Sequence, residues 1–192
     1  MSQLNFYMVR HAPVVNKAGK IYGDDADVDL DIVSAQLAEL AATLPHPDKS
    51  MWYSSGIERA TVTANAVLAR MSLNEDLLNI HQGFREQDFG TLIGRGHDQL
   101  DGMASFVDGK LFSPEPPDGE TISLLCERVA KAIKEVSNLA VAQKLENIVF
   151  FCHGGTIRAA HLYFNNLSLD HFIDLYTPHA VVHRFKSFAE HV

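Results

Sequence analysis

Short apolar runs recur along this chain, and each is bounded by polar or turn-forming residues. They cover residues 4–9, 51–53, 77–81, 147–152 and 181–188. Runs of this length are typical of β-strands, because an amphipathic helix needs a longer segment with a different spacing. We therefore predict five strands.

Apolar residues between these runs recur every three or four positions, which predicts helices that each have one apolar face. The predicted helices cover residues 33–44, 57–70, 120–143 and 156–164. Asp31 is a candidate N-cap for the first helix, and Pro45 and Pro47 would end it. Strands that alternate with helices predict an α/β fold, a three-layer α/β/α sandwich around a mostly parallel sheet.

Periodicity fails between residues 83 and 117, where six glycines and three prolines occur. A long aperiodic segment inside a compact domain is typical of loops that shape a substrate pocket. We predict a lid insertion over 83–117 with short helical pieces. With a length of 192 residues and no linker or repeat, the chain is expected to form one domain, 1–192.

The formal net charge of −8 and the absence of a basic face argue against a nucleic-acid or anionic-membrane partner. An anionic substrate would therefore need a local cluster of cations. Cys126 and Cys152 do not make a disulfide framework, which favours a reducing compartment. We find no secretory signal and no apolar run long enough to span a bilayer, so a cytoplasmic protein is expected.

Two of the predicted strands end in a histidine. Arg10 and His11 follow the first strand, and His153 follows the run that ends at Cys152. If both strands are central and parallel, both imidazoles emerge at one edge of the sheet, where α/β proteins bind ligands. Gly154 then opens a helix whose free N–H groups favour an anion at the same edge.

A third strand-to-helix junction supplies another cation. The turn Ser54-Ser55-Gly56 precedes a helix that carries Arg59 in its first turn. Guanidinium groups bind phosphate oxygens through two parallel hydrogen bonds. Two arginines and two histidines at helix N-termini therefore predict a phosphate or oxyanion pocket.

Four motifs occur in order along the chain. They are Arg10-His11, Ser-Ser-x-x-x-Arg59-Ala60-x-x-Thr63-Ala64, Arg85-Glu86-x-Asp88-Phe89-Gly90 and Cys152-His153-Gly154-Gly155. Together they resemble the histidine phosphatase superfamily, which also includes cofactor-dependent phosphoglycerate mutase. The resemblance implies the phosphoglycerate mutase-like fold and a nucleophilic His11 that becomes phosphohistidine. It also implies that Arg10, Arg59 and His153 hold the phosphoryl oxygens, that Glu86 donates a proton, and that neither a metal nor a cofactor takes part.

The chemistry of these side chains agrees with those roles. A neutral imidazole is a competent nucleophile at physiological pH. The pKa of Glu86 would have to be raised, because the carboxyl must be protonated when the leaving group departs. Gly154 is expected to contact the phosphate, and Tyr22 and Gly23 are candidates for contacting the rest of the substrate.

For some of these residues, the alternative to a functional role is a structural or solvent-exposed one. Apart from the family resemblance, Glu86 has the weakest evidence for a catalytic role, because acidic side chains in loops are commonly just exposed to solvent. The family usually has glycine where this chain has Ala12, and we expect that variation to be tolerated. His179 and His183 show no convincing metal-ligand spacing, so we expect them to be structural or exposed and predict no metal site.

The segment from Arg85 to Gly90 resembles the phosphatase branch more than the mutases. The segment from Pro114 to Thr121 resembles an element of α-ribazole phosphatases, so α-ribazole 5′-phosphate is the nearest substrate guess. The expected substrate is a small phosphorylated metabolite, and the expected oligomeric state is a monomer or a homodimer. Two alternatives stay open: phosphoglycerate mutase-type phosphoryl transfer, and a non-catalytic module that binds a phosphorylated ligand.

Overall fold

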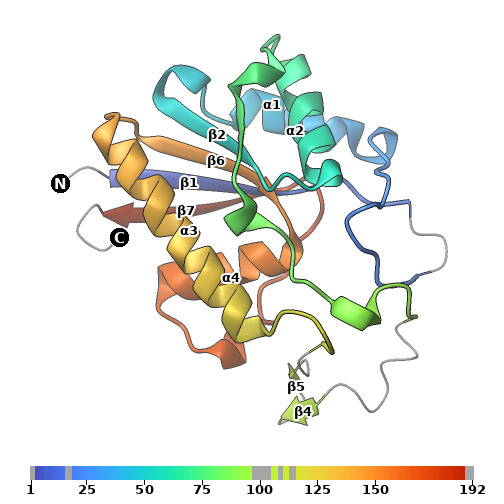
Figure 1. The fold of residues 1–192 in the computed structure, drawn as a ribbon. Coiled ribbons are helices and arrows are strands. Elements are labelled where there is room, and N and C mark those ends of the chain that lie inside the picture. The colour runs from blue at the N-terminus through green and yellow to red at the C-terminus, as the bar shows by residue number, and fades with distance from the viewer. Residues whose placement is uncertain (1–2, 16–18, 97–104, 108–109, 113–115, 189–192) are drawn as a thin grey trace.

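A five-stranded sheet forms the centre of the computed structural model, which describes residues 3–15, 19–96, 105–107, 110–112 and 116–188 (Figure 1). The strands are β1 (Gln3–Arg10), β2 (Ser50–Ser54), β3 (Leu78–Ile80), β6 (Asn147–Cys152) and β7 (Val182–Phe188). Their order is β3-β2-β6-β1-β7, with β7 antiparallel to β1 and the other pairs parallel. The five predicted strands and the mostly parallel sheet are confirmed.

Helices cover both faces of this sheet. They are α1 (Ser34–Thr43), α2 (Glu58–Arg70), α3 (Ile122–Ala142) and α4 (Gly154–Asn165). Figure 1 shows α1 and α2 on one face and α3 and α4 on the other. The predicted three-layer sandwich is therefore confirmed, and its four main helices occupy the segments where apolar residues recur at helical spacing.

Successive residues of the central strands point to opposite faces and meet two separate cores. Ile148 and Phe150 join the core under α3 and α4, whereas Val149 and Phe151 join the core under α1 and α2. All four side chains are at most 1% exposed. Burial on both faces explains why β6 is apolar from Ile148 to Cys152 and does not alternate.

Short 3₁₀ turns link the main elements. They are η1 (Asp31–Val33), η2 (Pro47–Lys49), η3 (Glu75–Leu77), η4 (Gln82–Phe84), η5 (Gly90–Leu92) and η7 (Leu169–His171). The prediction that Asp31 caps the first helix is wrong: the Asp29 carboxylate accepts the N–H groups of Asp31 and Ile32 instead. At the start of α3 the Thr121 hydroxyl accepts the Leu124 N–H at 3.0 Å, which makes Thr121 a true side-chain cap.

The segment 83–117 contains the turns η4 and η5, as predicted, and also a hairpin that the sequence does not predict. Its strands are β4 (Ser105–Val107) and β5 (Lys110–Phe112), which pair antiparallel. Gly90 has a φ of +49°, and a Cβ there would lie 2.2 Å from the Pro117 carbonyl oxygen. Only glycine fits this close approach of the two ends of the segment. Other parts of the expected lid, residues 97–104, 108–109 and 113–115, lie outside the described residues.

None of the described helices is both long enough and apolar enough to cross a membrane.

Candidate active site

Two histidines meet at the carboxyl ends of the neighbouring strands β1 and β6. The ring centroids of His11 and His153 are 5.2 Å apart, and both side chains are at most 1% exposed. The His11 N–H donates to the Cys152 carbonyl at 3.0 Å, which continues the parallel ladder one residue beyond β1. The two imidazoles therefore emerge on the same side of the sheet, as the sequence predicts.

The hydrogen bonds of His11 define which ring nitrogen is free. Its Nδ1 lies 2.6 Å from the Ala12 carbonyl oxygen, which can only accept, so Nδ1 carries the proton. The lone pair is then on Nε2, on the opposite side of the ring. Burial, together with the positive charges of Arg59 and Arg10, lowers the pKa of His11 to about 3. The ring is thus neutral near pH 7.

Arg59 faces that lone pair from the first turn of α2. Its Nε donates to His11 Nε2 at 3.3 Å, and its Nη1 donates to the Gly23 carbonyl at 2.7 Å. The guanidinium also lies 5.2 Å from the centre of the Tyr22 ring. The side chain is 2% exposed, so this arginine is a buried cation. Tyr22 and Gly23 therefore border the site through Arg59.

His153 is held by Ser55 through one of its two ring nitrogens. The Ser55 hydroxyl lies 2.8 Å from His153 Nε2 and accepts the Ile57 N–H at 3.2 Å. The Ser55–His153 contact fits either direction, and when the hydroxyl donates to Nε2 the ring proton is on Nδ1. Nδ1 is buried and has no hydrogen-bond partner among the described residues. Burial lowers the pKa of His153 well below its ordinary value, and the nearby charges act in the same direction.

Arg10 is held by the segment that leads into β7. Its Nη1 donates to the Thr177 carbonyl at 2.6 Å, and its own carbonyl accepts the Ala180 N–H at 2.9 Å. Its Nε is buried, and this N–H is unpaired in the part of the chain that the structure describes. A Cβ on Gly154 would lie 3.2 Å from the Thr177 hydroxyl and 3.5 Å from Arg10 Nε. Gly154 therefore lies directly against this arginine at the start of α4.

Glu86 reaches the site from the loop after η4. Its Oε1 accepts the Gln87 N–H at 3.0 Å and the Gly155 N–H at 3.1 Å. A Cβ on Gly155 would lie 2.5 Å from that oxygen, so a side chain there would displace the carboxyl group. Burial raises the pKa of Glu86, and the backbone hydrogen bonds and the charges of Arg59 and Arg10 oppose this only in part. Such a carboxyl can hold or release a proton more readily near neutral pH than an exposed one.

A third imidazole lies beside His11 that sequence analysis did not place there. The ring centroids of His179 and His11 are 5.3 Å apart, and within the described ranges His179 Nε2 is buried without a hydrogen-bond partner. Burial, with the charge of Arg10, lowers the pKa of His179 to about 4. The sequence offers no signal for this position, because His179 belongs to the irregular segment before β7. Ser55 and Thr177 were missed for a related reason, since their roles depend on tertiary contacts.

Ala12 is fully buried in the core under α1 and α2. Its N–H donates to the Thr63 hydroxyl at 2.9 Å. Arg85 forms an ion pair with Asp24 at the edge of the site.

Cys152 is fully buried, and burial raises the pKa of its thiol, which disfavours the thiolate form that a nucleophile needs. Within the described residues, no group of three or more His, Cys, Asp or Glu side chains could hold a metal ion.

A family model of the histidine phosphatase superfamily (branch 1) matches residues 6–191. The chain belongs to this superfamily. The match spans all four motifs and the whole sheet apart from the first residues of β1. Membership of this superfamily supports phosphatase activity for the chain.

Solved structures share the fold over nearly the whole chain. A mycobacterial glucosyl-3-phosphoglycerate phosphatase has a TM-score of 0.74 at 19% identity, covering 96% of this chain and 90% of that one. An Escherichia coli K-12 protein provisionally assigned as an alpha-ribazole-5′-P phosphatase has a TM-score of 0.77 at 19% identity, covering 95% and 90%. A variant of the Entamoeba histolytica phosphoserine phosphatase, in complex with phosphoserine, has a TM-score of 0.74 at 20% identity, covering 94% and 89%. A comparison with curated protein sequences finds no significant match.

Proposed function

We propose that this chain is a metal-independent phosphomonoesterase that acts through a phosphohistidine on His11. The observation that supports this most strongly is the convergence of Arg59 and His153 on the His11 ring: one donates to its free nitrogen at 3.3 Å, and the other has its ring centroid 5.2 Å away. Phosphoryl transfer requires mainly positioning of the groups and stabilisation of charge on the equatorial oxygens. Buried guanidinium and imidazole groups supply both.

In the first step, His11 Nε2 attacks phosphorus and the bond from phosphorus to the ester oxygen breaks. The leaving alkoxide takes the proton from the Glu86 carboxyl. The donors around His11 then bind the phosphoryl oxygens: the guanidinium groups of Arg10 and Arg59, and Nδ1–H of His153. For Arg59 this means that the hydrogen bond to His11 Nε2 is exchanged for one to the substrate.

In the second step, water attacks the phosphohistidine and the P–N bond breaks. The Glu86 carboxylate accepts a proton from the attacking water, inorganic phosphate leaves, and both His11 and Glu86 return to their starting states. A raised pKa suits Glu86 to this double role, because general acid–base catalysis is most effective when the pKa lies near the working pH.

A small phosphorylated metabolite is the proposed substrate class, and α-ribazole 5′-phosphate is the specific candidate. Two observations favour that candidate: the sequence element from Pro114 to Thr121, and the fold similarity to the Escherichia coli protein provisionally assigned that activity. The test is a screen of phosphorylated metabolites with phosphate release as readout. α-Ribazole 5′-phosphate should have the highest kcat/KM. If its kcat/KM were no higher than that of unrelated phosphomonoesters, it would be excluded as the specific substrate.

The phosphatase assignment itself is tested with p-nitrophenyl phosphate at mildly acidic pH. Wild type should release p-nitrophenol, and His11→Ala should reduce the rate to background. Equal rates in both proteins would remove the nucleophile assignment, and absence of turnover with retained phosphate binding would favour a non-catalytic binding module. With 3-phosphoglycerate and 2,3-bisphosphoglycerate, isomerisation that outpaces phosphate release would favour a mutase.

A further inference from the structure

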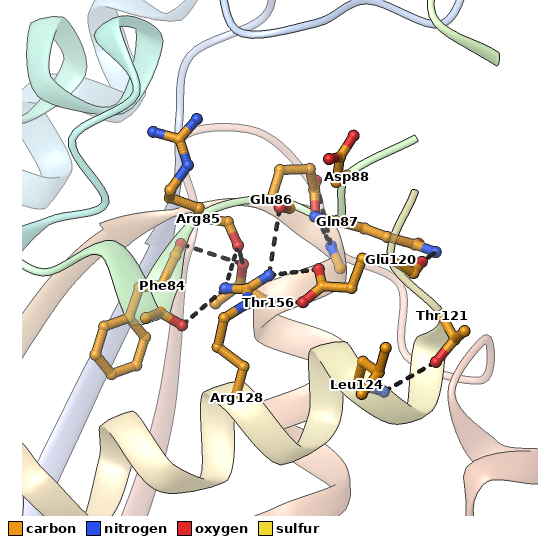
Figure 2. Close-up of polar contacts among 12 residues, drawn as sticks. Phe84, Arg85, Glu86, Gln87, Asp88, Glu120, Thr121, Leu124, Arg128 and Thr156 are labelled. Atoms are coloured by element: carbon orange, nitrogen blue, oxygen red, sulfur yellow. Dashed lines mark hydrogen bonds and ion pairs between the residues drawn. The ribbon is translucent and has the colours of Figure 1, made fainter. Parts of the chain in front are cut away.

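Arg128 on α3 holds the loop that carries Glu86 through both terminal nitrogens of its guanidinium group. Figure 2 shows this side chain pointing from the helix into the bend of the loop. Nη1 donates to the carbonyls of Gly83 and Arg85 at 2.9 and 3.1 Å. Nη2 donates to the Glu86 carbonyl at 3.4 Å. Three backbone carbonyls within four residues are thus bound by one side chain.

The remaining donors of Arg128 bind Glu120 in a two-pronged ion pair. Nε lies 2.8 Å from Glu120 Oε1, and Nη2 lies 2.6 Å from Oε2. The two side chains are 28% and 16% exposed, so water screens this pair less than it screens a surface pair. Arginine is suited to this task, because its five N–H donors are fixed in a planar fork that lysine lacks.

Glu120 also holds the other side of the same loop through its backbone. Its N–H donates to the Asp88 carbonyl at 2.8 Å, and its carbonyl accepts from Gln87 Nε2 at 2.8 Å. From α4, the Thr156 hydroxyl donates to the Arg85 carbonyl at 2.9 Å (Figure 2). The backbone on both sides of Glu86 is therefore fixed, and the carboxyl itself accepts the N–H groups of Gln87 and Gly155.

We propose that Arg128, fixed by Glu120, is a positioning residue that sets the place of the Glu86 carboxyl in the reaction. In the described part of the chain, the hydrogen bonds of Arg128 go to Gly83, Arg85, Glu86 and Glu120. Its effect therefore reaches the reacting atoms through Glu86. Proton transfer requires heavy atoms within about 2.6–3.2 Å, and displacement of a catalytic group by about 1 Å can cost about a hundredfold in rate. This inference rests on the proposed function, because it presumes that Glu86 is the proton donor.

Leaving groups of different basicity separate positioning of the acid from general damage to the site. The p-nitrophenolate of p-nitrophenyl phosphate departs without a proton, whereas the alkoxide of glycerol 2-phosphate needs one. The value of kcat/KM reports the step in which the ester bond breaks. The ratio of kcat/KM for the alkyl ester to that for the aryl ester therefore measures the contribution of the proton donor.

The experiment measures this ratio for wild type, Glu86→Gln, Arg128→Lys and the double variant. We expect Glu86→Gln to lower the ratio by about 10²-fold or more, the usual contribution of a general acid. Arg128→Lys should lower it by about tenfold, and it should have little further effect when Glu86 is already Gln. Lys131→Met, which removes an exposed cation from the same helix, is the control and should leave the ratio unchanged.

The inference on Arg128 would be overturned if Arg128→Lys lowered kcat/KM equally for both substrates. It would also be overturned if the effect of Arg128→Lys on the ratio added in full to that of Glu86→Gln in the double variant. A Glu86→Gln variant with an unchanged ratio would instead overturn the acid role in the proposed function itself. Should Arg128→Lys fail to fold, Glu120→Gln is the second variant. It keeps the carbonyl contacts of Arg128 but weakens the ion pair, and it should lower the ratio in the same direction by a smaller factor.

Discussion

Arg59 Nε lies 3.3 Å from His11 Nε2, so a buried guanidinium donates to the one lone pair from which a histidine nucleophile can react. In the free protein this contact orients the ring and disfavours its protonation. During reaction the same guanidinium has to turn to a phosphoryl oxygen. The pair is therefore both a resting contact and part of the proposed phosphate site.

Replacement of Arg59 by lysine should lower kcat by about 10²-fold to 10³-fold, because the ammonium group keeps the charge but cannot bind two oxygens at once. Steady-state kinetics with p-nitrophenyl phosphate measures this. Arg70→Lys, at the exposed end of the same helix, is the matched control and should behave as wild type. An Arg59→Lys enzyme within about threefold of wild type would contradict a role in binding the transition state.

Glu86→Gln should increase the free energy of unfolding at alkaline pH. The pKa of Glu86 is raised in the folded protein, so the folded state binds more protons than the unfolded state between the two pKa values, and stability is lost as pH rises through the folded pKa. Gln mimics the protonated carboxyl and can keep both backbone hydrogen bonds, since both reach the same oxygen, Oε1.

The measurement for Glu86 is the melting temperature of both proteins at pH 4.5 and pH 8. The variant should gain stability relative to wild type only at the higher pH. A variant that is less stable than wild type at pH 8 would show that the ionised carboxylate is stabilising in the fold, contrary to the raised pKa.

Stability should fall when the pH drops below about 6.5, the ordinary pKa of histidine. The pKa of His11 is lowered to about 3 and that of His179 to about 4, so at pH 5 these rings are neutral when folded and protonated when unfolded. The unfolded state then binds more protons, and the free energy of unfolding decreases as pH falls through this window. Unfolding at pH 5 should take up about one proton fewer in His179→Asn than in wild type. Equal proton uptake by both proteins would mean that His179 has an ordinary pKa in the fold.

His179 should contribute to turnover through its unpartnered nitrogen beside His11. We expect His179→Ala to lower kcat/KM by about tenfold, the value of one hydrogen bond to a charged group, and to weaken inhibition by orthovanadate. His179→Asn retains an N–H donor and should recover part of the loss. His46→Ala, which alters an exposed histidine, is the control. If His179→Ala matches wild type in both measurements, the third imidazole takes no part in binding the phosphoryl group.

Much of the fold and of the site follows from local patterns in the chain. The strand over Asn147–Cys152 is predicted with the observed bounds, because its residues from Ile148 to Cys152 are covered on both faces and all apolar, and the apolar run ends at the polar His153. The meeting of His11 and His153 follows from one further rule, that parallel strands present their carboxyl ends at one edge.

Other features depend on contacts that no local pattern encodes. His179 lies beside His11 because β7 pairs with β1 in the antiparallel direction, and the sequence does not specify that partner. The strands Ser105–Val107 and Lys110–Phe112 were missed because three residues are too few for a reliable alternating pattern. Asp29 rather than Asp31 caps the first helical turn, which is an error of two residues in a segment with several acidic candidates.

Direct trapping of the covalent intermediate tests the central claim. Wild type would be mixed with a phosphorylated substrate, quenched in denaturant at alkaline pH, where phosphohistidine survives, and mapped by mass spectrometry of its peptides. We predict one phosphoryl group on His11, which is absent from His11→Ala and accumulates in Glu86→Gln when its second step is slowed. Turnover by wild type with no phosphoryl group on His11 at any quench time, or with the group on another residue, would contradict the account.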